Sequence, residues 1–183
     1  AKKMGLDIDQ LVIASNENDI LHRTLVSGVY SKKGLQQTIS PSMDIQIASN
    51  FERLLFELYD RENDSVVEAM EGLVQNGKFK LSPDALKKLR ADFMSGSASE
   101  LLTYETIEQT LTKYGQLVCP HTAVGLAVAN DFYEKDQTST PMVTLATAHP
   151  AKFPDAVKKC TGKTPVLPDR YGDLFSKEEV LTP

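Results

Sequence analysis

The sequence predicts an α/β fold in which parallel-sheet elements flank a helical insertion. Residues 11–14 form a continuous apolar run, Leu-Val-Ile-Ala, which is typical of a strand covered on both faces. A polar loop and an amphipathic stretch ending at Gly28 follow directly, which is the order of a βαβ unit. A second apolar run spans residues 142–146, whereas residues 51–115 show helical periodicity without a strand signal.

These patterns divide the chain into three predicted parts. Residues 1–50 are expected to form an α/β segment of a ligand-binding domain. Residues 51–115 are expected to form a helical insertion. Residues 116–183 then return to the α/β domain and end in a tail rich in proline.

In the first part, the polar loop after the strand offers Asn16 or Asn18 as the cap of the following helix. Further on, Thr38 and Ile39 allow only a brief strand, because Pro41 follows them and cannot donate to a sheet. We therefore interpret the polar residues of both stretches as structural.

Capping patterns predict four helices in residues 51–115. Ser or Thr at a helix start, with Glu three residues later, satisfies backbone N–H groups that otherwise have no partner. The predicted starts are Ser49 with Glu52, Ser65 with Glu68, Ser82 with Pro83, and Thr103. Gly77 and Gly115 are the predicted ends of two of these helices.

Small residues characterise the helix predicted to begin near Pro120. Ala123, Gly125, Ala127 and Ala129 would let this helix lie close against a sheet or a neighbour that carries a cofactor. A short last helix is predicted over residues 155–162.

Composition excludes several classes of function. The net charge is −5 and basic runs are absent, which argues against binding to nucleic acid or an anionic membrane. No apolar run approaches the roughly 20 residues of a membrane span, and the start lacks the apolar region of a signal peptide. Two cysteines are too few for a disulfide framework and suit a reducing compartment, so we expect a cytoplasmic protein. The string AKKMGL is typical of a helix end, so we expect a piece of a longer protein.

Two further motifs are candidates for chemistry. Cys119 and His121 could suggest zinc or a catalytic pair, but only His22 and His149 remain as further histidine ligands. We predict no metal site and a buried thiol at Cys119. No two of the ten glycines lie within three residues of each other, which excludes a glycine loop for phosphate within this chain.

Polar side chains follow the second apolar run directly. Thr147, His149 and Lys152 stand where the carboxyl end of a parallel strand would lie. Ligands of open α/β sheets bind at such ends, so the sequence predicts a ligand site near Thr147.

Four strings carry a resemblance to a known family: IASNENDILHR, TISPSMDIQIASNFERLLFEL, PHTAVG and LATAHPAKFP. They resemble threonine synthase of the branch found in proteobacteria and fungi, over essentially the whole chain. The resemblance implies a pyridoxal-phosphate enzyme of fold type II, similar to tryptophan synthase β. It also implies conversion of O-phospho-L-homoserine and water to L-threonine and phosphate.

The resemblance also assigns roles to five residues. Thr147 matches the residue that faces the pyridine nitrogen of the cofactor, and His121 and Thr122 match the residues along its edge. His149 and Lys152 are expected to order the loop or to approach the phosphate of the substrate. The family's Schiff-base lysine and its GNFG-type phosphate loop have no counterpart here, and Lys152 does not match that lysine.

No catalytic residue is therefore expected in this chain, which would be inactive without an N-terminal remainder of the same enzyme. Two alternatives stay open. One is a non-catalytic relative of threonine synthase that binds a ligand or has a regulatory role. The other is an independent helical interaction domain in residues 51–115.

Overall fold

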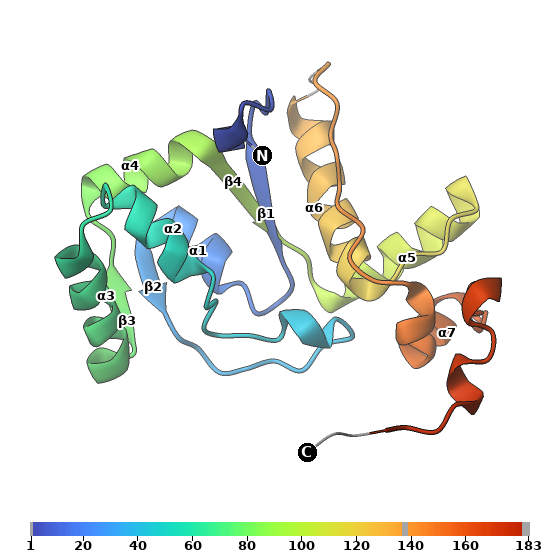
Figure 1. Cartoon of the computed structure of the whole chain (residues 1–183). Coiled ribbons are helices and arrows are strands. Elements are labelled where there is room, and N and C mark those ends of the chain that lie inside the picture. Colours follow the sequence, from blue (N-terminus) through green and yellow to red (C-terminus); the bar gives the residue numbers. More distant parts are fainter. Residues whose placement is uncertain (1, 137–138, 181–183) are drawn as a thin grey trace.

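The fold is mixed α/β, with one parallel and one antiparallel two-stranded sheet (Figure 1). The computed structural model describes residues 2–136 and 139–180. The elements in chain order are η1 (Lys2–Met4), β1 (Leu11–Ser15), α1 (Ile20–Ser27), β2 (Val29–Ser31), η2 (Pro41–Met43), α2 (Phe51–Leu58), α3 (Asn63–Asn76), β3 (Lys78–Lys80), α4 (Pro83–Asp92), β4 (Phe93–Ser97), α5 (Glu100–Tyr114), α6 (Pro120–Asp136), η3 (Pro150–Lys152), α7 (Pro154–Thr161), η4 (Asp169–Tyr171) and η5 (Leu174–Ser176).

The central sheet pairs β1 with β4 in parallel, from Leu11 opposite Phe93 to Ser15 opposite Ser97. The prediction that residues 51–115 contain no strand is therefore wrong, since β3 and β4 both lie in this range. The sequence of β4, Phe-Met-Ser-Gly-Ser, lacks β-branched residues, so its local pattern is weak. It becomes a strand because β1 supplies its hydrogen-bond partners. The division of the chain into three parts stays a prediction.

Helices cover both faces of the central sheet, as expected for a parallel pair. Successive side chains of β1 point to opposite faces: Ile13 packs against one buried cluster and Ala14 against another. Helix α1 contacts both strands, and so does α6 (Figure 1). The predicted first strand and the helix that follows it are confirmed.

The larger core lies among α1–α4 and the antiparallel sheet. Tyr30 of β2 stacks between Phe51 and Phe79, with ring centroids 5.2 and 4.9 Å apart. Its hydroxyl accepts a hydrogen bond of 2.8 Å from the amide of Ala48. Burial raises the pKa of Tyr30, so the phenol stays neutral at the centre of this core.

Small residues let α6 approach the central sheet closely. A Cβ atom added at Gly96 of β4 would lie 2.7 Å from Cγ1 of Val128, so glycine is required at this crossing. Ala123 and Ala127 of α6 are buried. Ala127 lies in a buried cluster with Ala14 of β1, so this one of the predicted small side chains faces the sheet.

Glycines end four helices, three of them as the sequence predicts. Gly28, Gly77, Gly115 and Gly162 follow α1, α3, α5 and α7, and each has a positive φ between 68° and 74°. In this left-handed region a side chain is disfavoured, which explains why glycine closes these helices.

The predicted helix starts are only partly confirmed. Ser82 accepts a hydrogen bond of 3.2 Å from the amide of Ala85 and caps α4. Helix α5 begins earlier than predicted: Ser99 is its cap, and Thr103 instead donates from its hydroxyl to the carbonyl oxygen of Ser99. A hydroxyl inside a helix bonds back to the preceding turn, and this competes with a capping role.

The two predicted capping boxes, at Ser49 with Glu52 and at Ser65 with Glu68, are wrong. Helix α2 begins at Phe51 and α3 at Asn63, and neither has a side-chain cap. Residues that match a capping box in sequence form one only where the backbone before the helix is extended. The residue before α2, Asn50, is already helical in φ and ψ.

The strands predicted at residues 142–146 and at Thr38 with Ile39 are also wrong, because neither segment forms a strand. Residues 142–146 run beside α6 (Figure 1), and Val143 and Leu145 are 78% and 79% exposed. No strand among the described residues pairs with this segment. An apolar run becomes a strand only where a neighbour satisfies its backbone groups.

Candidate functional site

The candidate site lies beyond the carboxyl ends of β1 and β4, near the N-terminus of α6. The amide of Ala98 donates to the carbonyl oxygen of Ser15 over 2.9 Å and extends the pairing of the two strands by one residue. Beyond this point the amide of Glu100 donates to the carboxylate of Glu17. The two chain segments that leave the sheet at this edge are therefore joined by hydrogen bonds.

Three side chains form what we name the Thr–Cys cluster: Cys119, Thr122 and Thr147. Their polar atoms form a triangle, with 3.2 Å between Cys119 Sγ and Thr122 Oγ1. The other two sides are 3.5 Å, from Cys119 Sγ to Thr147 Oγ1, and 3.2 Å, between the two hydroxyl oxygens. The amide of Thr147 donates to Thr122 Oγ1 over 3.1 Å, and the amide of Thr122 donates to the sulfur over 3.4 Å. The sequence predicted two of these residues as neighbours of one ligand, and the fold brings both together.

The cluster has a buried side and an open side. Cys119 is completely buried and Thr122 is 6% exposed, whereas Thr147 is an exposed residue. The inner contacts of the Thr147 hydroxyl go to Thr122 and Cys119. The hydroxyl is thus held from behind and keeps hydrogen-bonding capacity for a ligand on its open side.

His121 joins three segments of the chain. Its Nε2 accepts a hydrogen bond of 3.1 Å from the amide of Ser42 in η2. Its ring lies 4.5 Å from that of Phe153, between η3 and α7. The remaining ring nitrogen, Nδ1, is buried and makes no hydrogen bond within the described part of the chain.

The surroundings of Cys119 favour its thiolate. Burial alone would raise the pKa of Cys119, but contacts with His121, Thr122 and Thr147 outweigh burial and lower the pKa to about 6. His121 Nδ1 makes no hydrogen bond of ordinary geometry within the described residues, yet His121 is the first of the side chains that lower the pKa of Cys119. The buried thiol was predicted, but its polar partners were not.

His149 and Lys152 lie on the next turn of the chain. His149 Nδ1 accepts a hydrogen bond of 3.2 Å from the amide of Ala151 and caps η3. The ammonium group of Lys152 lies 5.7 Å from the centre of the Phe153 ring. Neither side chain bonds to the Thr–Cys cluster in the described residues, so their suggested contacts with a substrate stay a prediction.

A second polar network was missed by the sequence reasoning. Asn16 and Asn18 are 2% and 3% exposed, and neither caps α1, whose N-cap residue Asp19 makes no side-chain capping bond. Instead Asn16 Nδ2 and Asn18 Nδ2 donate to the carboxylate of Asp44 over 2.8 and 2.9 Å. Thr38 donates to the same carboxylate from its amide and its hydroxyl.

This network holds the loop around η2 over the end of β1. The same loop carries the Ser42 amide that donates to His121. By holding this loop, the network positions the His121 imidazole through the Ser42 amide. The available signal was the single Asp between apolar residues in SMDIQI, because a carboxylate in such a setting is often held by hydrogen bonds.

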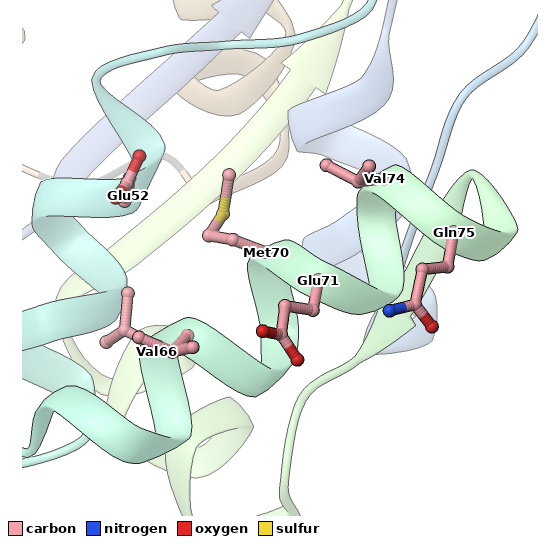
Figure 2. A pocket seen from close by; sticks show the side chains of 7 residues that line it. Glu52, Val66, Met70, Glu71, Val74 and Gln75 are labelled. Atoms are coloured by element: carbon pink, nitrogen blue, oxygen red, sulfur yellow. The ribbon is translucent and has the colours of Figure 1, made fainter.

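Two shallow surface grooves lie elsewhere. One runs between α2 and α3 (Figure 2) and is lined by Glu52, Val66, Val67, Met70, Glu71, Val74 and Gln75. The other lies between α5 and α7 and is lined by Leu101, Tyr104, Glu105, Glu108, Lys159 and Cys160. Neither groove includes a residue of the Thr–Cys cluster.

Residues 2–136 and 139–180 hold neither a cluster suited to a metal ion nor a helix suited to a membrane. No three His, Cys, Asp or Glu side chains in these ranges gather in a way that could hold a metal ion. Within the same ranges, no helix combines the length and apolar character that a membrane crossing requires.

Comparisons with known proteins agree with this architecture. A family model described as "Threonine synthase, C-terminal" matches residues 122–183. The chain is 43% identical over 183 residues to threonine synthase of Pseudomonas aeruginosa, covering 100% of this chain and 39% of that protein. The crystal structure of PLP-bound threonine synthase from Brucella melitensis is 52% identical, with a TM-score of 0.92, over 100% of this chain and 39% of the other.

The crystal structure of threonine synthase from yeast gives a similar result. It is 36% identical, with a TM-score of 0.87, over 97% of this chain and 39% of the other. The chain thus spans about 39% of the length of the relatives that it matches. In sequence and in fold, this chain belongs to the threonine synthase family, of whose full-length members it represents a portion.

Proposed function

We propose that this chain is the C-terminal part of a threonine synthase that converts O-phospho-L-homoserine and water to L-threonine and phosphate. The observation that carries the proposal is the Thr147 hydroxyl, which Thr122 and Cys119 hold at the carboxyl edge of the sheet with its outer side open. A PLP-bound relative has the same fold over the whole chain, which supports a cofactor at this edge. The low cysteine count and the net charge of −5 support a cytoplasmic enzyme.

The residues of the site fit pyridoxal phosphate. Thr147 would face the pyridine nitrogen, because a neutral hydroxyl donates to or accepts from this atom without forcing it to be protonated. His121 and Thr122 would lie along the edge of the cofactor, and both are held by hydrogen bonds to backbone amides. When bound, pyridoxal phosphate supplies an electron sink for the substrate.

This chain would position the cofactor and exclude water behind it. The buried side of the Thr–Cys cluster, with Cys119 completely buried, closes the site from the interior. His149 and Lys152 would approach the phosphate of O-phospho-L-homoserine from η3. We assign no catalytic residue to this chain, and an N-terminal remainder of the enzyme would supply the lysine that binds the cofactor. The chain alone should therefore form no threonine.

The test is a series of variants at Thr147 in the full-length enzyme. Thr147→Ser should keep the cofactor and most of the activity, because the hydroxyl is retained. Thr147→Ala should retain cofactor less well on dialysis, since an unpaired buried nitrogen costs about 1–3 kcal/mol. Thr147→Asp should bind the cofactor with an altered absorbance spectrum and lose most threonine formation, because a carboxylate favours the protonated nitrogen.

Phosphate release from O-phospho-L-homoserine and threonine formation measure the reaction directly. Unchanged turnover and an unchanged spectrum in Thr147→Asp would show that Thr147 does not face the cofactor. Retention of pyridoxal phosphate without any turnover of O-phospho-L-homoserine by the full-length protein would instead favour the non-catalytic alternative.

A further inference from the structure

The Thr–Cys cluster contains a sulfur that the proposed reaction does not use. We propose that Cys119 is a positioning residue whose proton decides whether the Thr147 hydroxyl donates to, or accepts from, the group bound at its open side. This inference rests on the proposed role of Thr147. It is carried by the triangle of contacts and by the hydrogen-bonding state of His121.

The number of hydrogens in the triangle limits how the hydroxyls can point. Three contacts join Cys119, Thr122 and Thr147, and a hydrogen bond at every one of them would need three hydrogens. A thiol and two hydroxyls supply three hydrogens, whereas a thiolate and two hydroxyls supply two. Loss of the thiol proton therefore forces a rearrangement.

With a thiolate, both hydroxyls donate to the sulfur, because an anion is the stronger acceptor. The Thr122 hydroxyl can do so because its bond with the Thr147 amide, at 3.1 Å, uses a lone pair of Oγ1 and leaves the hydroxyl hydrogen available. Thr147 then presents only lone pairs on its open side. In this state it would accept a hydrogen bond and favour a protonated ring nitrogen in the cofactor.

With a neutral thiol, the S–H group can donate to Thr147 Oγ1, which lies 3.5 Å away. When Thr122 donates to the sulfur at the same time, both contacts of the sulfur are satisfied. The hydroxyl hydrogen of Thr147 can then point outward, and the contact between the two hydroxyl oxygens holds no hydrogen. In this state Thr147 would donate a hydrogen bond and favour an unprotonated ring nitrogen. The thiolate and the neutral thiol of Cys119 would thus favour different protonation states of the ring nitrogen in the cofactor.

His121 supplies an independent reason for the thiolate. The Ser42 amide donates to Nε2, so the neutral imidazole carries its hydrogen on Nδ1. This N–H is buried, since His121 is 6% exposed, and it makes no hydrogen bond in the described residues. A negative sulfur nearby compensates such a donor, and His121 is the first of the contacts that lower the pKa of Cys119 against the effect of burial. The other groups that act on the sulfur, Thr122 and Thr147, carry no formal charge.

The test is a pH titration of the ultraviolet absorbance of the thiolate in the cofactor-free, full-length enzyme. The difference between the parent and Cys119→Ser isolates this sulfur from all other cysteines. We expect a step near pH 6, in line with a pKa of about 6. Thr147→Val should move the step upward by about one unit, because a hydrogen bond to the charged form is removed. Cys160→Ser is the matched control: burial raises the pKa of Cys160 to about 11, so its removal should leave the step unchanged.

A second measurement follows the absorbance of the bound cofactor with pH. In the parent, the spectrum should change with the midpoint measured for Cys119, and Cys119→Ser, which stays neutral, should abolish this change. A Cys119 step in the ordinary range of a thiol, or a step that Thr147→Val does not move, overturns the positioning role even if Thr147→Ala loses cofactor. If the step occurs as expected but Thr147→Ala retains cofactor like the parent, the proposed function fails and the inference falls with it.

Discussion

The hydroxyl oxygens of Thr122 and Thr147 lie 3.2 Å apart, although 25 positions separate the two residues in the chain. The Thr147 amide donates to the same Thr122 oxygen. One threonine in the first turn of α6 therefore fixes both the backbone and the side chain of the residue proposed to face the cofactor.

Thr122→Val should loosen the segment that carries Thr147. Valine keeps the shape of threonine but removes the acceptor of the partly buried Thr147 amide, and an unsatisfied donor costs up to about 1–3 kcal/mol. Faster hydrogen exchange at the Thr147 amide would report this loss. Thr112→Val is the matched control, because Thr112 is exposed and its hydroxyl contacts only carbonyl oxygens of its own helix, those of Glu108 and Gln109, in the described residues. Equal exchange rates at Thr147 in all three proteins would contradict the role of Thr122.

His121→Phe should destabilise the protein by about 1–3 kcal/mol, because the buried acceptor of the Ser42 amide is lost. Phenylalanine keeps an aromatic ring against Phe153, so the change tests the hydrogen bond more than the packing. Thermal unfolding measures the effect. For comparison, His149→Asn keeps an acceptor for the Ala151 amide and should change the stability little. If His121→Phe unfolds at the temperature of the parent, the imidazole does not hold the loop around η2.

Stability should rise with pH between about 6 and the value of 9.0 that is ordinary for a thiol, because the pKa of Cys119 is lowered to about 6 in the folded state. In this window the unfolded chain binds the proton and the folded chain does not, so unfolding becomes less favourable as pH rises. The contribution is fully present above pH 9.0 and is lost as pH falls toward 6.

The expected slope is at most about 1.4 kcal/mol per pH unit for one group. Urea unfolding at several pH values should show this slope in the parent and not in Cys119→Ser. The same slope in both proteins would mean that another group is responsible.

Gly96→Ala should destabilise the central sheet by about 1–3 kcal/mol through overpacking. The new Cβ atom would lie 2.7 Å from Cγ1 and 3.3 Å from Cγ2 of Val128, so α6 must move away from β4. Gly34→Ala is the matched control, because no atom lies within 4 Å of a Cβ at that position. In a Val128→Ala background the penalty of Gly96→Ala should shrink, and a penalty of unchanged size would show that the crossing of α6 and β4 is not its cause.

The sequence by itself determined the features whose signals lie close together in the chain. The apolar run 11–14 predicted β1, Ser82 with Pro83 predicted the start of α4, and glycines predicted the ends of three helices. These signals are local because caps and glycine turns depend on backbone geometry within a few residues. The strings that resemble threonine synthase also pointed to the family, since they are long enough to be specific.

Only the tertiary structure decided which segments pair and which polar groups are buried together. Residues 93–97 form a strand because β1 lies beside them, whereas the more apolar residues 142–146 have no partner strand in the described part of the chain. Asn16 matched a helix cap in sequence but is held by Asp44, 28 positions away. The pKa of Cys119 is likewise lowered in part by Thr147, 28 positions away. Strand pairing and buried polar networks require partners distant in the chain, and no local pattern specifies which partners will meet.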